Sequence, residues 1–507
     1  MQNNFYITTP IYYVNDIPHI GHAYTSYAAD SLARYNKLLG KKVFFSTGTD
    51  EHGQKVELSA RDKNMEVESF TDTISKKFKD LSETLNLSNN DFIRTTEIRH
   101  KDFVCSIWKK LLENDQIYLD VYKGWYSVRD ESFISEADIK IDENQNKIGP
   151  SGDLLRWVEE PSYFFRLSNW QEQLLNLYNK NKDFVMPKSR FNEVIKFVEG
   201  GLEDLSISRT SFKWGIKVPD DPKHVMYVWL DALFNYISVL KNHNNKNIVS
   251  NFWPANFHIV GKDILRFHAV YWPAFLLAAN IEFPKTIFAH GWWTINGSKM
   301  SKSLGNTIDP NFLVEKYGSD TLRYFLLREI PFGEDGNFSE ELLKIRANSD
   351  LSNDYGNLIQ RVLAMVVKYK NGIVPEGKNL NNEDKSLIKT PINDIVEIEK
   401  LMKSCQFNLV LATIWKNIRA ANAYVDKNKP WSLAKENSQR LDTVLNVLVN
   451  TIFKINTILQ PFLPSSTIKI FNMLGQFNEI EFKDINREIE VGTKIIKPVS
   501  VFPRIES

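Results

Sequence analysis

The first fifty residues alternate strand and helix signals in an order that narrows the choice of fold. Residues 5 to 8 are aromatic or β-branched, which is typical of a strand. From about residue 19 to residue 37 apolar side chains recur every three or four positions, which predicts a helix ending near Gly40. Residues 42 to 46 have the composition of a buried parallel strand. Strand, helix and strand in this order predict the opening of a doubly wound α/β domain.

The segment between the first strand and the helix predicts an anion site. Pro10 and Pro18 keep it extended, because proline fixes φ and biases the preceding residue away from the helical region. His19, Gly21 and His22 fall at the start of the helix, where free backbone N–H groups and the helix dipole attract anions. Gly21 lets a ligand approach the backbone, and the imidazoles add donors. We predict a phosphate site, although histidines there also serve as ordinary caps.

Length, charge and cysteine content limit the class of protein that this chain can belong to. With 507 residues and 43% apolar content it should hold more than one domain. Because the net charge is only +1, a nucleic-acid partner must be bound by local basic patches. Cys105 and Cys405, the two cysteines, exclude a disulfide framework and fit a reducing compartment, which we expect to be the cytoplasm. The sequence shows no secretion signal and no apolar run of about 18 residues, so we expect no membrane span.

A second motif lies near residue 300, where the chain reads KMSKSLGN over residues 299 to 306. A lysine pair in a loop of serines and glycine is usually a solvated turn. Here it follows the HIGH segment of residues 19 to 22 at a domain-scale distance. The two motifs in this order resemble those of class I aminoacyl-tRNA synthetases.

The resemblance narrows to the methionyl-tRNA synthetases. It rests on the stretches TPIYYVNDIPHIGH, TGTDEHGQK, DLSISRTSF, YVWLDAL, GKDILRFHAVYWPA, GWW, KMSKSLGN and NDYGNLIQR. They span residue 8 to about residue 361, with a weaker match to the end. The family implies a ligase whose partners are L-methionine, ATP with Mg²⁺ and tRNA(Met). It would form methionyl-adenylate first and then pass methionine to the 2′-hydroxyl of the terminal ribose of the tRNA.

The family also implies a Rossmann-type parallel sheet with an inserted connective domain, followed by an all-α helix-bundle anticodon-binding domain. We place the first half of the catalytic domain at residues 1–115, the insertion at 116–220, the second half with the lysine loop at 221–345 and the helical domain at 346–507. Composition supports the insertion, because residues 118 to 148 become strand-like and charged. Where relatives carry the cysteines of a zinc knuckle, this chain has Ser127 and Asp130, so we predict no structural zinc.

The resemblance assigns ATP contacts to both motifs and to two strand ends. The residues concerned are Pro10, His19, Gly21, His22, Gly261, Asp263, Trp293, Lys299, Met300, Ser301, Lys302 and Ser303. Gly261 and Asp263 would meet the ribose, and Trp293 would lie near adenine. The catalytic groups would be His19, His22, Lys299 and Lys302. The histidines would hold the phosphates while the lysines neutralise the departing pyrophosphate. No general base is needed, since the attacking carboxylate is already ionised, and Mg²⁺ would bridge the phosphates without a protein cage.

A second set of residues is implied to bind methionine. It comprises Ile11, Tyr13, Asp50, Trp229, Ala232, Leu233, Tyr236, Ile264, His268 and Trp272. Aromatic rings make favourable contacts with the polarizable sulfur of methionine. Rings at helical spacing are more often core, but Trp229 and Trp272 follow predicted strand ends beside the nucleotide site. Asp50 would bind the substrate ammonium, or else cap a turn. His268 fits a core position nearly as well, and Leu233 stands where some relatives have proline.

Helical periodicity dominates beyond residue 346 and predicts an antiparallel bundle. The resemblance implies that Asn357 and Arg361 on one helix, and Trp431 in a later turn, read the anticodon. Their four-residue spacing puts the first two on one helix face, and unpaired bases are recognised by stacking and edge hydrogen bonds. Without the resemblance a solvated face would be favoured for this pair. The tryptophan would be either a clamp on the bundle or a stacking platform.

Two alternatives to this function exist. A class I synthetase for Ile, Val or Leu needs a large editing insertion, because a hydrophobic pocket discriminates one methylene by only about 1–3 kcal/mol. The insertion here is too short for that, and an enzyme for cysteine would show zinc ligands. A non-catalytic RNA-binding relative would have lost either lysine or both histidines, whereas both motifs are intact. Some relatives carry an extra dimerising module that this sequence lacks, so we expect a monomer.

Overall fold

The computed structural model describes residues 4–128, 132–134, 136–295, 297–299, 307–436 and 438–506. Its centre is a six-stranded sheet in which all neighbouring strands are parallel. In spatial order the strands are β3 (Asp91–Arg94), β2 (Lys42–Asp50), β1 (Asn4–Tyr13), β14 (Phe257–Gly261), β15 (Thr286–His290) and β9 (Val185–Met186). The strand order reverses between β1 and β14. The predicted doubly wound sheet is therefore confirmed, with its switch point between these two strands.

Strand β1 is longer than the sequence predicts, because it continues past Pro10 to Tyr13. Its register with β2 shifts between Thr8 and Ile11. Such an irregularity accommodates a proline, which cannot donate a hydrogen bond to the ladder. Beyond the shift Tyr13 lies opposite Asp50, which ends β2 rather than lying in the loop predicted for it.

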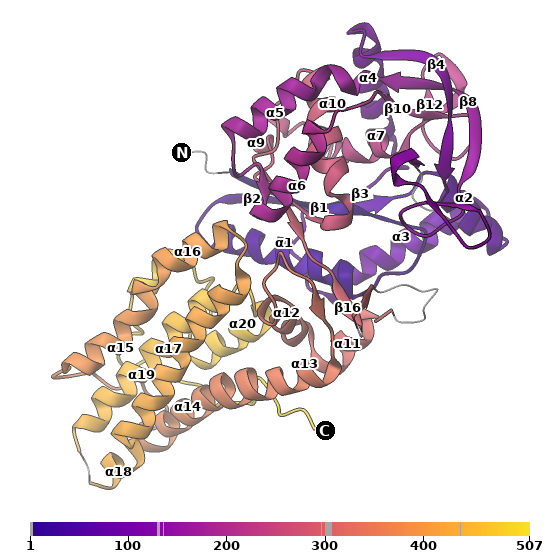
Figure 1. Cartoon of the computed structure of the whole chain (residues 1–507). Helices are drawn as coiled ribbons and strands as arrows, with labels where there is room; N and C mark the ends of the chain where they lie inside the picture. The colour runs from indigo at the N-terminus through magenta and orange to yellow at the C-terminus, as the bar shows by residue number, and fades with distance from the viewer. Residues whose placement is uncertain are drawn as a thin grey trace.

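Helices cover both faces of this sheet (Figure 1). Side chains alternate along β1, so Phe5 and Ile7 belong to one core cluster and Tyr6 to the other. Helix α1 (Ile20–Leu38), which follows the predicted range closely, packs on the first face. The second face carries α4 (Ile98–Glu113), α5 (Gln171–Lys180), α6 (Lys188–Glu199), α8 (Asn235–Lys241) and α10 (Trp272–Ala278). Helices α2 (Gln54–Asp62) and α3 (Val67–Thr84) form a smaller cluster with the end of β1.

The chain between α4 and α5 leaves the parallel sheet and forms an antiparallel one, to which a short strand after α6 is added. This sheet has the order β10 (Leu205–Ser206), β8 (Arg156–Phe165), β4 (Ile117–Ser127) and β5 (Ser132–Ile134). Ser127 Oγ donates to Asp153 Oδ2 at 2.7 Å, and Asp130 lies outside the described residues. Within the described part of the chain no group of three or more His, Cys, Asp or Glu side chains could hold a metal ion.

Small strands and short helices fill the rest of the first 340 residues. The strands are β6 (Lys140–Ile141), β7 (Lys147–Ile148), β11 (Ser208–Arg209), β12 (Lys217–Val218), β13 (Asp221–Met226), β16 (Trp293–Ile295), β17 (Ser298–Lys299) and β18 (Gly336–Asn337). The helices are α7 (Val228–Leu233), α9 (Val249–Phe252), α11 (Pro310–Tyr317) and α12 (Ser319–Arg328). The sequence predicts a strand running into a helix over residues 227 to 233. The structure has the strand earlier, in β13, and residues 228–233 are wholly helical, because a short apolar run fits either structure.

The rest of the chain is mostly helical, as predicted. The sequence predicts one helix from residue 346 to residue 370, but the structure begins it earlier. It starts as α13 (Glu340–Arg346), continues as π-helical turns over Ala347–Gly356 and ends as α14 (Asn357–Lys370). The others are α15 (Asn382–Asn393), α16 (Ile395–Lys403), α17 (Phe407–Asn428), α18 (Pro430–Lys435), α19 (Arg440–Leu459) and α20 (Pro464–Met473). Helix α19 is buried along most of its length and forms the centre of this domain. Across the described helices none combines the length and apolar character needed to cross a membrane.

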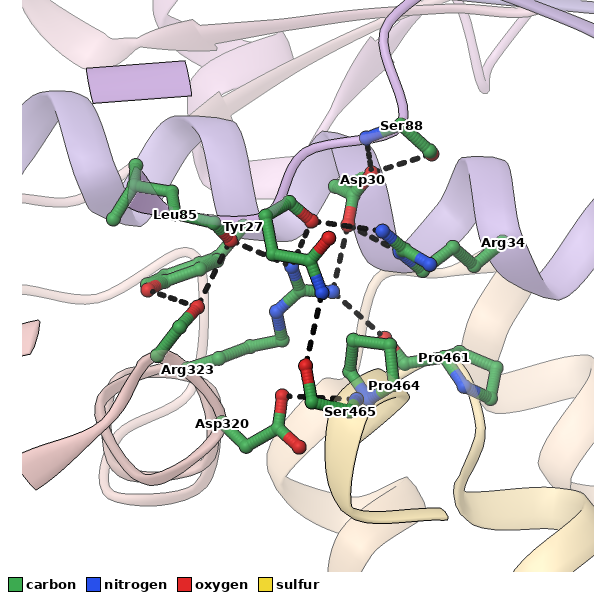
Figure 2. A network of polar contacts seen from close by, with 12 residues as sticks. Tyr27, Asp30, Arg34, Leu85, Ser88, Asp320, Arg323, Pro461, Pro464 and Ser465 are labelled. Atoms are coloured by element: carbon green, nitrogen blue, oxygen red, sulfur yellow. Dashed lines mark hydrogen bonds and ion pairs between the residues drawn. The ribbon is translucent and has the colours of Figure 1, made fainter. Parts of the chain in front are cut away.

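A buried ion pair within the catalytic domain also contacts the helical domain, through the carbonyl oxygen of Pro461 (Figure 2). Arg323 of α12 and Asp30 of α1 are both fully buried, and Arg323 Nη1 lies 2.6 Å from Asp30 Oδ2. The same carboxylate accepts from Arg34 Nε at 2.6 Å, and from the backbone and hydroxyl of Ser88. Arg323 also donates to the carbonyl oxygens of Leu85, Asn86 and Pro461. This junction, defined by Asp30, Arg323 and their partners, ties α1 to the turn between α19 and α20.

Candidate active site

Helix α1 begins with two histidines that cap it reciprocally. Nδ1 of His19 accepts the backbone N–H of Gly21 at 3.1 Å, and Nδ1 of His22 accepts the backbone N–H of His19 at 3.0 Å. In a neutral imidazole one nitrogen accepts and the other carries the hydrogen. Each neutral ring therefore carries its hydrogen on Nε2, as a donor. Capping and anion binding, which the sequence sets against each other, use different nitrogens of the same rings.

The environment of these rings keeps His22 neutral. Burial, together with the neighbouring His19, lowers the pKa of His22 well below its usual value. The two ring centres lie 4.0 Å apart. A Cβ on Gly21 would stand 2.9 Å from Cε1 of His19, so glycine is needed here to make room for the capping ring. The sequence alone suggests only that it makes room for a ligand.

The chain just beyond the KMSKSLGN stretch contacts this helix terminus. The backbone N–H of Ile20, inside the HIGH segment, donates to the carbonyl oxygen of Ile308 at 3.0 Å. Ile308 is therefore tied to the start of α1. The backbone of Lys299 lies in β17, where it pairs with Thr294 of β16. Four predicted site residues lie outside the described part of the chain: Met300, Ser301, Lys302 and Ser303.

The ends of β14 and β15 form the neighbouring surface. Asp263 is exposed, and its Oδ1 accepts from Trp292 Nε1 at 3.0 Å. A Cβ on Gly261 would lie 2.6 Å from Asp263 Oδ1, so a side chain there would displace this carboxylate. Lys262 Nζ contacts both carboxylate oxygens of Asp335 at 2.8 and 2.6 Å. The predicted ribose residues thus sit at the switch-point edge of the sheet, held by a tryptophan that the sequence analysis does not single out.

Trp293 is placed differently from its neighbour. It is 2% exposed and packs against Tyr24, Phe325 and Phe338, with ring centres 5.6 to 6.2 Å apart. Its indole ring therefore belongs to the core between α1 and α12. Of the two tryptophans in the GWW stretch, Trp292 is the one whose ring lies beside Asp263.

The predicted methionine residues come from four segments, and the structure gathers them on the second face of the sheet. Ala232, Leu233, Tyr236, His268 and Trp272 are each at most 4% exposed. Ile11, Tyr13, Trp229 and Ile264 are only partly buried and pack against the same cluster. Trp229 stacks on Phe267 with ring centres 3.8 Å apart and planes within 6°. The partly buried residues lie at the surface of this cluster, and the buried ones pack in its interior.

Hydrogen bonds fix the tautomers of two buried histidines in this cluster. Nδ1 of His268 lies 2.9 Å from the carbonyl oxygen of Ile264 and must donate to it, so Nε2 accepts the hydroxyl of Tyr236 at 2.7 Å. His258 accepts the indole N–H of Trp272 on Nε2 at 3.3 Å and donates from Nδ1 to Thr8 Oγ1 at 2.8 Å. Burial lowers the pKa of His268 to about 4. Both rings are therefore neutral and hold Tyr236 and Trp272 in place.

A separate cluster in the helical domain contains the predicted anticodon residues. Arg361 Nη2 donates to Asp426 Oδ1 at 2.8 Å, and its guanidinium carbon lies 5.9 Å from the ring centre of Trp431. Trp431 is 37% exposed. It lies in the short helix α18 and not in an irregular turn, because Lys429 ends α17 with φ of 44° and Pro430 starts a new helix. Asn357 is exposed one turn before Arg361 on α14.

A histidine-capped helix at the switch point of a parallel sheet, in a chain that also carries the HIGH and KMSKS sequences, is typical of the class I aminoacyl-tRNA synthetases. The family model described as "tRNA synthetases class I (M)" matches residues 5–363, and that described as "Anticodon binding domain of methionyl tRNA ligase" matches residues 374–507. The chain belongs to the methionyl-tRNA synthetase family.

Named relatives agree over the full length of the chain. The methionine–tRNA ligase of Rickettsia bellii is 52% identical over 100% of both chains, and that of Listeria monocytogenes is 45% identical over 100% of this chain and 78% of its own. The solved structure of Mycobacterium tuberculosis methionyl-tRNA synthetase with methionyl-adenylate superposes with a TM-score of 0.96 at 43% identity, covering 99% of this chain and 100% of that one.

Three residues that the sequence analysis does not assign also border this region. Asp231 of α7 accepts hydrogen bonds from His52 and His100, and all three are at most 2% exposed. Asp231 and His52 occur within the quoted stretches YVWLDAL and TGTDEHGQK, so the sequence contains a signal for both. His100 lies on α4 in a stretch without a motif, and only the folded chain shows its partner.

Proposed function

We propose that this chain ligates L-methionine to tRNA(Met) in two steps. A carboxylate oxygen of methionine attacks the α-phosphorus of ATP, which forms methionyl-adenylate and releases pyrophosphate. The terminal ribose hydroxyl of the tRNA, at the 2′ position, then attacks the methionyl carbonyl and releases AMP. The observation that carries the proposal is the hydrogen bond between Ile20 and Ile308, because it ties the chain just beyond KMSKSLGN to the helix start where phosphates would bind.

For the first step we assign phosphate binding to the start of α1. His19 and His22 would donate from Nε2 and Gly21 lies between them, while Lys299 and Lys302 would neutralise the departing pyrophosphate. The other ATP contacts would come from Pro10, Gly261, Asp263, Trp293, Met300, Ser301 and Ser303. Asp263 and Gly261 would meet the ribose from the edge of the sheet.

Methionine would bind between β1, β2 and the aromatic cluster. Asp50, next to Tyr13 at the strand ends, would pair with the substrate ammonium. Trp229 and Tyr13 would contact the thioether side chain, since sulfur–aromatic contacts are favourable. Buried residues behind them, above all Tyr236 and Trp272, would keep this surface rigid.

Mg²⁺ would arrive with ATP. In the described residues no cluster of three His, Cys, Asp or Glu side chains forms a cation cage, and Mg²⁺ in such enzymes is commonly held by substrate phosphates and water. It would neutralise phosphate charge when bound.

The tRNA would be read at the far end of the molecule. Arg361 and Trp431 face each other there, and Asn357 lies on the same side of α14. Trp431, being partly exposed, would stack on an unpaired base, while Arg361 and Asn357 would bond base edges. We propose that the enzyme works as a monomer in the cytoplasm, and sedimentation as a dimer at micromolar concentration would contradict the first part.

Amino-acid-dependent ATP–pyrophosphate exchange, measured across the twenty amino acids, tests the first step. We expect exchange with methionine alone. Exchange with another amino acid would keep the enzyme class and overturn the specificity. No exchange from folded protein would favour a non-catalytic RNA-binding role instead.

Substitution of the second lysine tests the loop. Lys302→Ala should raise the barrier to adenylate formation by about 2–4 kcal/mol, as losses of preorganised charge stabilisers do. Lys316→Ala, on the exposed face of α11, is the control and should exchange like the wild type. Near-wild-type exchange in Lys302→Ala would remove this residue from the mechanism.

Substitution in α18 separates the two steps. Trp431→Ala should leave ATP–pyrophosphate exchange unchanged and weaken tRNA charging by about 1–3 kcal/mol, the typical value of one base–aromatic stack. Aminoacylation kinetics with tRNA as the varied substrate measure this. Equal charging by the variant would mean that Trp431 only clamps the bundle.

A further inference from the structure

A buried carboxylate lies directly behind the proposed methionine site. Asp231 is 0% exposed, as is His100, and His52 is 2% exposed. His52 Nδ1 lies 2.6 Å from Asp231 Oδ2, and His100 Nε2 lies 2.7 Å from Asp231 Oδ1. The other nitrogen of His100, Nδ1, is 2.8 Å from Ser238 Oγ. We call His52, Asp231 and His100 the carboxylate–imidazole bridge.

The bridge connects elements that each carry proposed substrate contacts. Asp231 sits in α7 between Trp229 and Ala232, both assigned to methionine. His52 comes two residues after Asp50, the proposed partner of the substrate ammonium. His100 belongs to α4, and Ser238 to α8. One carboxylate therefore fixes the helix that contacts the thioether side chain to the loop behind the residue that would hold the ammonium.

The chemistry of the bridge makes it a rigid connection. A carboxylate only accepts hydrogen bonds, so both imidazoles donate to it, each from the nitrogen that faces it. Although burial opposes ionisation, the two histidines lower the pKa of Asp231 to about 2. Both oxygens of an ionised carboxylate are thus engaged, and such charge-assisted bonds are among the stronger ones available to a protein.

Helix α7 depends on tertiary contacts to fix its orientation. It has six residues, and its N-cap residue, Tyr227, makes no side-chain cap. Isolated helices this short are not stable, so tertiary contacts must hold them. The loop at the other end of the bridge is anchored in turn, because Trp214 packs against the His52 ring and donates from Nε1 to the carbonyl of Glu51.

We infer that Asp231 is a positioning residue for methionine binding: through its bridge to His52 and His100 it sets the distance between Trp229 and Asp50. This inference rests on the proposed function, since it takes the methionine contacts from there. It adds a residue that touches no substrate and nevertheless decides how well the substrate fits.

Kinetics of ATP–pyrophosphate exchange distinguish this role from a general loss of stability. Asp231→Asn keeps the size of the side chain but places an amide nitrogen opposite one imidazole donor. We expect the KM for methionine to rise by between about tenfold and a hundredfold, as small misplacements of substrate-positioning groups do, while the KM for ATP stays within about twofold. A merely structural defect would lower the amount of active enzyme and leave both KM values alone.

Paired variants of the histidines provide a rescue test. In His52→Asn the amide nitrogen can stand near the position of Nδ1, and in His100→Gln near that of Nε2, so each can still donate to Asp231. His52→Ala and His100→Ala cannot. We expect the alanine variants to raise the KM for methionine and the amide variants to restore most of the loss.

Comparison of Asp50→Asn with Asp231→Asn distinguishes a wrong positioning role from a wrong methionine site. Asp50→Asn reports on the site itself, so an unchanged KM for methionine in that variant would count against the proposed function. If Asp50→Asn raises this KM and a folded Asp231→Asn does not, the positioning role is wrong. Should Asp231→Asn fail to fold, the His100→Ala and His100→Gln pair decides, and equal KM values in the two would overturn the inference.

Discussion

The protein buries two carboxylates, Asp30 and Asp231, and surrounds them differently. Asp30 faces the guanidinium groups of Arg323 and Arg34, and guanidinium groups present several donors in a fixed plane. Asp231 faces two imidazoles, each of which donates from one ring nitrogen. The first network joins two helices of the catalytic domain that are far apart in the sequence, and it reaches the helical domain through Pro461. The second connects neighbouring elements of one site.

The difference teaches where permanent charge is useful. A junction between domains must hold under all conditions, and arginine supplies donors that can also bond the carbonyl oxygens of Leu85, Asn86 and Pro461. Substitutions that break each network separately should change the free energy of unfolding by different amounts and with different pH dependence.

The largest loss of stability is expected at the junction around Asp30 and Arg323. Arg323→Met should lower the free energy of unfolding by about 3–5 kcal/mol, because it leaves Asp30 buried without its main counter-charge. Urea unfolding followed by circular dichroism measures the loss. Arg328→Met, in the same helix but partly exposed, is the matched control and should cost far less. Equal losses in the two variants would mean that the ion pair contributes nothing beyond packing.

An acid-dependent effect is expected at the site. The pKa of folded His268 is about 4, below the ordinary value of about 6.5. Below pH 6.5 the unfolded chain takes up a proton that the folded chain refuses, so stability is full above that pH and declines as pH falls toward 4. This one group accounts for about 3 kcal/mol over that range. Free energies of unfolding measured at several pH values should show the decline. In His268→Asn the decline should be smaller by the amount assigned to His268.

The carboxylate of the bridge titrates in a lower range. Because its folded pKa is about 2, Asp231 contributes stability above about pH 4 and loses it only as pH falls from there toward 2. An acid decline already present between pH 6.5 and 4 therefore belongs to the buried histidines. The two windows can be told apart in one titration of the wild type and His268→Asn.

A small effect is expected at the edge of the junction. Arg34→Ala should lower the free energy of unfolding by about 1 kcal/mol or less, because this side chain is 23% exposed and Asp30 keeps Arg323 and Ser88 as partners. Thermal melts of the variant and the wild type compare them. A loss as large as that of Arg323→Met would contradict the assignment of Arg323 as the main counter-charge.

Local signals predict the sheet, its opening helix and the helical domain, because each depends on neighbouring residues. The HIGH and KMSKS stretches likewise point to one end of the sheet. Side-chain orientation is harder, as Trp292 and Trp293 show: Trp292 lies just before β16 and Trp293 begins it, and only the folded chain shows which ring meets the core. The pairing of Asp30 with Arg323 depends on tertiary packing alone and has no sequence signature.

The rod formed by α13, the π-helical turns and α14 limits how the length of this chain can change. It runs without a break from Glu340 to Lys370 and reaches from the catalytic domain into the helical domain (Figure 1). Each α-helical residue adds about 1.5 Å of length and about 100° of rotation. Losing one residue before Asn357 would swing Arg361 away from Trp431, and inserting seven would restore the direction but displace it by about 10 Å. The number of residues along this rod is therefore constrained as firmly as their identity.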